Sequence, residues 1–383
     1  MKQLAPLALL LAATAAGAPS GSFDEDEPPP PRCTKCDSVG RQPCDEHDDD
    51  DCALETNAQY CSFFAGCEPC GGTGWVDCEK CENEAGEAWL AERRRTQAEH
   101  AASLATYDEQ MDRALRKAKS EHFVIVWEID KLKVDKRLRD AHEMLHLTID
   151  RMERLYADYC AIFGATDREF AQDVVVLVWS LEQDQRQSSA AFCGNESANG
   201  VKLLGSSAVY SVCGSRQRFR GDEELHRNLV HSVAHLLLAH QEPSNWLGNR
   251  KGGWADAGVA HFFEMRYFGL CDNYCYQEVD SNRDFKGGDW KPAVRKMVAL
   301  DDVPPIALVF EQNTDTLTLP QHAVSFSYVD YLIALDGAKA GRLFRRLRER
   351  EETRDALRDV FEMNVLELEQ RWKEWVLDTY PAR

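Results

Sequence analysis

Two cysteine-rich segments with the same spacing constrain this chain more than any other feature of its sequence. Cys33-x-x-Cys36 is followed after seven residues by Cys44-x-x-His47, and the pattern recurs at Cys67-x-x-Cys70 and Cys78-x-x-Cys81. A C-x-x-C turn supplies two thiolates, and zinc takes four sulfur or nitrogen donors in a tetrahedron. Histidine in place of one cysteine keeps a zinc ligand but would lose a disulfide. The sequence therefore predicts two zinc ions, with these eight ligands: Cys33, Cys36, Cys44, His47, Cys67, Cys70, Cys78 and Cys81.

A disulfide-bonded secreted domain is the alternative reading of the same cysteines. The chain has 14 cysteines, so assigning seven to zinc leaves seven, and at least one must be unpaired or intermolecular. Cys193 and Cys213 bracket a glycine-rich stretch that they could staple, and Cys271 and Cys275 are close enough to pair. Cys160, on a strongly periodic helical segment, is expected to be a buried free thiol.

The second copy resembles the cysteine-rich zinc-binding domain of DnaJ-type chaperones. Cys67-Glu68-Pro69-Cys70-Gly71-Gly72-Thr73-Gly74 is similar to that family's C-x-x-C-x-G-x-G repeat, while the first copy keeps only Gly40. The resemblance covers residues 33–81 and brings no J-domain signature, so it implies a zinc module without co-chaperone activity. It also implies a crossed pairing, in which Cys33, Cys36, Cys78 and Cys81 share one zinc and Cys44, His47, Cys67 and Cys70 the other. Local pairing within each copy is the alternative.

The N-terminus has the pattern of a secretory signal. Lys2 gives a positive start, Leu4 to Ala16 are largely apolar, and Ala16-Gly17-Ala18 offers small residues for cleavage. Residues 1–18 are therefore expected to be a signal peptide of a secreted or periplasmic protein, with an uncleaved anchor as the alternative. Residues 19–32 are expected to be an acidic, proline-rich linker. We expect no membrane span after removal of the signal.

The rest of the chain predicts an α+β domain. We divide it into a zinc module over 33–82, a connecting helix over 83–121 and a second domain over 122–383. Strands are expected at 122–129, 173–179 and 200–212, and helices at 134–163, 222–241 and 254–268, with further helices toward the C-terminus. Strands followed by helices favour the α+β class. The net charge of −20 argues against a nucleic-acid partner.

One predicted helix carries His231-Ser232-Val233-Ala234-His235, which places two histidines on one face. Trp254-Ala255-Asp256-Ala257-Gly258-Val259-Ala260 follows. Together these segments resemble the peptidase-MA-like zinc peptidases (gluzincins), with their H-E-x-x-H and W-x-x-E-G-x-A patterns. The resemblance covers about residues 120–378 and implies a thermolysin-like fold.

Two departures from the family pattern decide the functional expectation. Ser232 stands where the family has its catalytic glutamate, and Ala257 stands where it has its third zinc ligand. We therefore expect no catalytic residues, and a pseudopeptidase that binds a polypeptide or a cell-envelope component. The alternative is an active zinc metallopeptidase with a rearranged ligand set of His231, His235 and His261. In that alternative Glu264 would act as base, and Asp256, next to Ala257, would point about 100° away from it.

Overall fold

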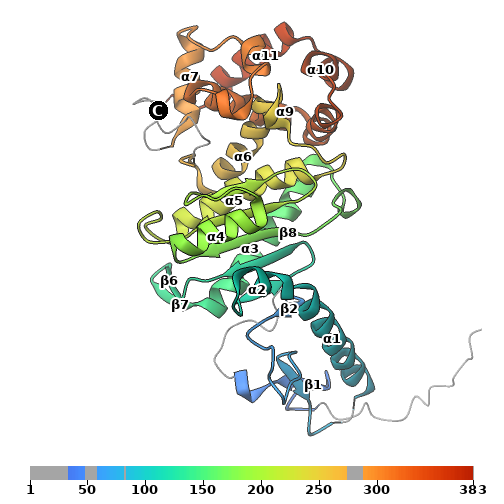
Figure 1. Ribbon diagram of the computed structural model, residues 1–383. Helices are drawn as coiled ribbons and strands as arrows, with labels where there is room; N and C mark the ends of the chain where they lie inside the picture. The colour runs from blue at the N-terminus through green and yellow to red at the C-terminus, as the bar shows by residue number, and fades with distance from the viewer. Residues whose placement is uncertain (1–32, 48–57, 82, 274–287, 383) are drawn as a thin grey trace, which may run out of the picture.

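The computed structural model describes residues 33–47, 58–81, 83–273 and 288–382. The expected signal peptide and linker lie outside the described residues, and so does Cys275, the expected partner of Cys271. The cysteine module (residues 33–81) lies at one end of the molecule, a six-stranded sheet in the middle and the C-terminal helices at the other end (Figure 1).

The cysteine module contains little regular structure. Strands β1 (Arg41–Pro43) and β3 (Trp75–Asp77) pair antiparallel, and one turn of 3-10 helix, η1 (Asp45–His47), follows β1. Gly40 and Gly74 precede the two strands with φ of 78° and 76°, a conformation that favours glycine. The helix α1 (Glu84–Ser103) follows the module, capped by the Asn83 side chain, which accepts a hydrogen bond from Gly86 N at 2.9 Å.

The central sheet combines segments from both sides of residue 82. Its order is β2-β4-β5-β8-β10-β9, with β5, β8 and β10 parallel and the outer strands antiparallel to their neighbours. Edge strand β2 comes from between the two cysteine segments, so the domain boundary expected near residue 82 is crossed by sheet pairing. The strands are β2 (Tyr60–Cys61), β4 (Lys117–Lys119), β5 (Phe123–Trp127), β8 (Val174–Trp179), β9 (Val201–Leu203) and β10 (Val209–Cys213).

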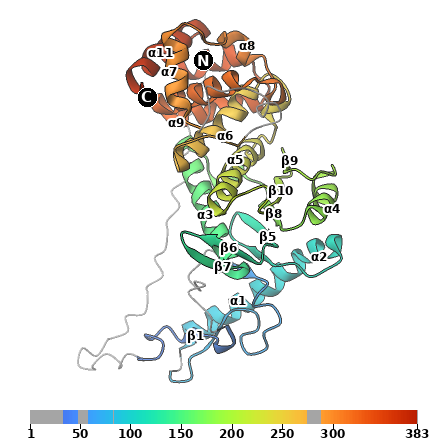
Figure 2. The same ribbon diagram turned by 90° about the vertical axis from the view of Figure 1, so that its left-hand side faces the viewer.

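Both faces of the sheet are buried. In β5, Phe123, Ile125 and Trp127 belong to the main core with α3 (Ala141–Phe163), whereas Val124 and Val126 belong to a second core. That second core receives side chains from α2 (Ala105–Met111) and α4 (Glu182–Cys193). Alternation of side chains along each strand thus supplies two apolar layers, and Figure 2 shows helices on both sides of the strands.

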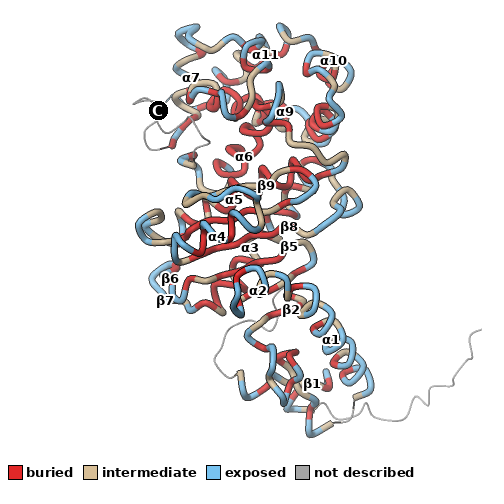
Figure 3. Tube along the Cα trace, viewed as in Figure 1, coloured by how far each residue is buried: buried red, intermediate tan, exposed pale blue. Residues whose placement is uncertain are grey.

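The C-terminal half is helical. α5 and α6 carry the second set of candidate site residues and lie between the sheet and the terminal helices (Figure 1). Burial is concentrated in the strands, α5, α6 and α9, whereas α1 is mostly exposed (Figure 3). The helices are α5 (Asp222–His240), α6 (Gly253–Phe268), α7 (Trp290–Ala299), α8 (Ile306–Phe310), α9 (Leu319–Arg348), α10 (Thr353–Phe361) and α11 (Val365–Thr379). Among the described helices, none has the length and apolar character needed to cross a bilayer.

The structure confirms the α+β class and corrects several element boundaries. α3 and α4 lie between the strands, so the order is not strands first and helices afterwards, and the resulting crossovers explain the parallel pairs. The connecting helix does not reach residue 121, because α2 ends at Met111 and β4 joins the sheet. The expected strand over 200–212 is a hairpin of β9 and β10, with Gly205 at φ 112° between them.

The helix expected from residue 134 begins at Ala141. Before it, β6 (Lys131–Val134) and β7 (Arg137–Asp140) form a hairpin around Asp135 and Lys136, whose φ angles are 53° and 117°. Alternating burial along β6 explains the strand. Asp140 then starts α3 with a capping box, and Gly164 (φ 67°) ends it as the sequence predicts.

Candidate metal sites

The four C-x-x-C or C-x-x-H turns of the cysteine module converge in two groups. The outer group contains Cys33, Cys36, Cys78 and Cys81, and the inner group contains Cys44, His47, Cys67 and Cys70. Each group joins one turn of the first copy to one turn of the second, which is the crossed arrangement that the DnaJ resemblance implies. The pairing of β1 with β3 brings the two copies together, since each strand lies between the turns of its own copy.

Distances within the groups suit a tetrahedral metal. In the outer group the Sγ atoms of Cys33 and Cys78 are 3.8 Å apart, and those of Cys36 and Cys81 are 3.3 Å apart. In the inner group Cys70 Sγ lies 3.4 Å from His47 Nε2. Donors around one zinc ion are separated by roughly 3.3–3.8 Å, given bonds of about 2.0–2.3 Å.

Disulfides would require a much shorter approach. Bonded sulfur atoms lie about 2.05 Å apart, whereas Cys44 and Cys67, from the inner group, have their Sγ atoms 3.9 Å apart. All the cysteines of both groups are free thiols. Cys193 and Cys213 are also free thiols, which corrects the expected staple, and Cys160 is a free thiol that is only half-buried.

The outer group cannot carry four thiolates without a compensating cation. Burial acts to raise the pKa of Cys36, but several hydrogen bonds, chiefly from Cys81 and from the Gly40 backbone, together outweigh it and lower that pKa to about 6. The same hydrogen bond and burial raise the pKa of Cys81 to about 12. One thiol in the group therefore ionises readily at the expense of its neighbours.

A second cluster lies between α5 and α6, around the predicted histidine pair. His231 Nδ1 lies 3.1 Å from a carboxylate oxygen of Glu264, and His261 Nδ1 lies 3.4 Å from the same oxygen. His231, His261 and Glu264 form a group able to hold a metal. His235 is not in that group, but its Nε2 lies 3.3 Å from His231 Nε2, so the predicted histidine pair does face across one helical turn.

The other ring nitrogen of His235 contacts Asp256. Its Nδ1 lies 2.9 Å from Asp256 Oδ1, and the other carboxylate oxygen accepts hydrogen bonds from Trp246 Nε1 (3.0 Å) and Thr314 Oγ1 (2.6 Å). Asp256 therefore contacts His235, and it does not belong to the group of His231, His261 and Glu264. Burial opposes ionisation of Asp256, but His235 and these donors outweigh it and lower its pKa to about 2.

The Glu264 carboxylate is fully satisfied by protein groups. Its Oε1 accepts hydrogen bonds from the backbone N–H of Asp272 (2.7 Å) and from the backbone (3.0 Å) and side chain (2.8 Å) of Asn273. Arg227 lies 3.8 Å away. Burial opposes ionisation of Glu264, but hydrogen bonds from His231 and His261 outweigh it and lower its pKa to about 2.

This cluster is enclosed, whereas the active site of a peptidase must be open to its substrate. Glu264 and His261 are 0% exposed and His231 is 2% exposed. Burial also lowers the pKa of His231 to about 3, so its imidazole is neutral near pH 7. A peptide substrate would need an open approach to these side chains.

A third group was missed by the sequence reasoning. Cys61, His142 and His146 place one possible ligand atom each within 4.8 Å of one another. Residues 142–146 read His-Glu-Met-Leu-His, an H-E-x-x-H pattern that could have drawn attention to the pair. Nothing in the sequence points to Cys61 as its neighbour. Burial raises the pKa of Cys61 to about 12 and lowers that of His146 to about 3.

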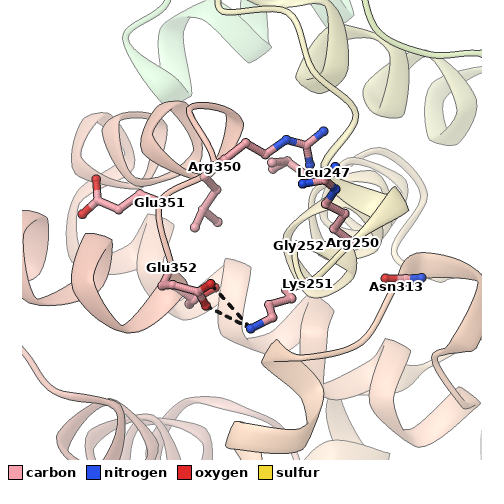
Figure 4. A pocket seen from close by; sticks show the side chains of 10 residues that line it. Leu247, Arg250, Lys251, Gly252, Asn313, Arg350, Glu351 and Glu352 are labelled. Atoms are coloured by element: carbon pink, nitrogen blue, oxygen red, sulfur yellow. Dashed lines mark hydrogen bonds and ion pairs between the residues drawn. The ribbon is translucent and has the colours of Figure 1, made fainter.

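A surface pocket lies between the loop before α6 and the connection of α9 to α10 (Figure 4). Lys251 Nζ lies 2.9 Å from Glu311 and 3.3 Å from Glu352, and Arg350 is hydrogen bonded to Asn249. These charges are already paired, so the pocket has no obvious acid–base set.

Comparison with known proteins adds no identification: no family model and no curated protein matches the chain.

Proposed function

We propose that this is a zinc-binding protein whose cysteine module holds two zinc ions. The observation that carries the proposal is the convergence of four turns into two sets of four donors at metal-like spacing. Four thiols in the outer group, and three thiols with one imidazole in the inner group, fill all four positions of a tetrahedral zinc, which is typical of structural sites. Zinc at both sites would cross-link the two copies of the repeat and contribute directly to their folding.

For the second domain, we propose a non-catalytic, peptidase-like binding domain. Ser232 and Ala257 at the two family positions support the loss of catalysis, and the paired, enclosed His231 and His235 support a role in the core. We retain the proposal of a polypeptide or cell-envelope partner, and secretion as proposed from residues 1–18. Such a partner would bind the outer surface, because the histidine pair is closed to it.

Metal analysis of single variants tests the zinc proposal. Cys36→Ser and Cys70→Ser should each lower the zinc content of the full chain by one equivalent, since each removes one donor of a different set. Cys160→Ser is the matched control, because this half-buried thiol lies outside both sets. Unchanged zinc content in both variants would refute the proposal.

The alternative, an active zinc metallopeptidase, is favoured by one observation: His231, His261 and Glu264 converge as a set of two imidazoles and one carboxylate. Hydrolysis of casein by zinc-loaded protein, lost in His231→Ala but kept in the control His100→Ala, would establish it. We expect no hydrolysis from either, because the set is enclosed and Glu264 is occupied by other hydrogen bonds.

A further inference from the structure

We propose that Cys61, His142 and His146 form a third metal site, for Zn²⁺, separate from the two sites of the proposed function. The set comprises one thiol and two imidazoles, donors that zinc accepts. Three protein donors leave one of zinc's four positions for water or a small anionic ligand. The site would therefore differ in kind from the two four-donor sites.

The two histidines are placed by one helix. His142 and His146 stand at i and i+4 in the first turns of α3, where side chains four apart share a face. Their Nε2 atoms lie 3.1 Å apart, so one metal ion can be bound by both. The capping box of Asp140 with Glu143 fixes the helix start, and with it the direction of both imidazoles.

The thiol is placed by the sheet. Cys61 lies in edge strand β2 opposite Ala118 of β4, and it is only 2% exposed. Because β4 and α3 belong to the same packed domain, Cys61 and the histidines meet through tertiary structure, although they are distant in sequence. All three donors therefore lie on regular elements, which is the kind of support that a metal site needs.

Aromatic rings line the site and connect it to the inner zinc group. Phe63 stacks on His142 with ring centroids 4.5 Å apart, and Phe64 meets the same imidazole edge-on at 5.1 Å. Phe64 also contacts His47 of the inner group at 4.7 Å. The third site is thus separated from the inner group by one phenylalanine side chain.

Hydrolytic chemistry does not follow from the H-E-x-x-H pattern here. Glu143 accepts a hydrogen bond from the Asp140 backbone N–H at 3.0 Å and lies 2.8 Å from Arg137, so its carboxylate serves the helix start. The structure favours a site that holds a metal and one exchangeable ligand.

The test counts zinc in the full-length protein after removal of metal under reducing conditions and reloading with Zn²⁺. Wild type should bind three equivalents, and His142→Ala, His146→Ala and Cys61→Ser should each bind two. The control His100→Ala, which changes a half-buried histidine on α1, should keep three. Circular dichroism checks that each variant is folded. If an alanine variant does not fold, Cys61→Ser, which preserves side-chain size, still tests the site.

Cobalt loading tests the exchangeable position. Azide should change the visible absorption of Co²⁺-loaded wild type, and His146→Ala should lose that response. Two equivalents of zinc in wild type, or three in the folded variants of Cys61, His142 and His146, would overturn the proposal of a third site. Failure of the two-zinc proposal gives a different result: wild type would bind one equivalent, and His146→Ala none.

Discussion

The cysteine module and the α5–α6 cluster use similar residue types in opposite ways. In the module, Cys70 faces His47 and other thiols, with no carboxylate in either group of four. Between α5 and α6, His235 and His231 each contact a buried carboxylate, Asp256 or Glu264. In the second cluster each of these imidazoles has a carboxylate partner, whereas the first offers only sulfur and nitrogen donors in each group of four. The comparison teaches that proximity of ligand-type residues predicts metal binding only when their other partners are known.

The strongest test of this difference is metal removal. A strong chelator should abolish hydrogen-exchange protection of residues 33–47 and 58–81 while α5 and α6 keep theirs. The reason is the size of the zinc contribution, about 10–16 kcal/mol for structural zinc in small domains. Hydrogen exchange with mass spectrometry measures both regions in one experiment. Equal loss of protection in the cysteine module and in α5 and α6, or no loss in either, would contradict the proposed difference between the two regions.

The next largest effect is expected from Glu264→Gln. This change removes a buried charge that faces Arg227 and accepts several N–H donors, so it should lower the free energy of unfolding by about 3–5 kcal/mol. Urea unfolding provides the measurement. Glu223→Gln is the matched control, since Glu223 also approaches Arg227 (3.4 Å) but is 77% exposed, and its loss should cost less than about 1 kcal/mol. Similar losses in the two variants would show that Glu264 has no special role.

A smaller effect concerns a half-buried histidine, whose environment keeps it neutral. His226 packs edge-on against Phe268, and burial lowers its pKa from 6.5 to about 3. Between pH 3 and pH 6.5 this histidine is protonated in the unfolded chain but not in the folded one. The free energy of unfolding is therefore highest above pH 6.5 and falls as the pH drops toward 3. Wild type should lose about 2 kcal/mol relative to His226→Gln between pH 7 and pH 5.

Urea unfolding of both proteins at the two pH values measures this difference. The same loss in wild type and variant would show that the His226 imidazole is not the group responsible.

The sequence contains enough information for the module but not for all of the second domain. Repeated spacing makes the eight donors visible, because each pair lies within one turn of the chain. Gly164 and the valines of β8 likewise give local signals for a helix end and a buried strand. The β6–β7 hairpin was missed because its strands have only four residues each. The contacts of Asp256 and the position of Cys61 depend on tertiary packing between distant segments, which residue periodicity does not report.

If zinc binds as proposed, edge strand β2 links the inner site to the solubility of the whole chain. It lies in the loop between Cys44 and Cys70, which the inner group closes, and it covers the outer side of β4. Loss of metal would free that loop and leave the backbone of β4 open to pairing with another molecule. A shortage of zinc would then cause self-association of an otherwise folded domain. The fraction of soluble protein would depend on the zinc concentration during folding.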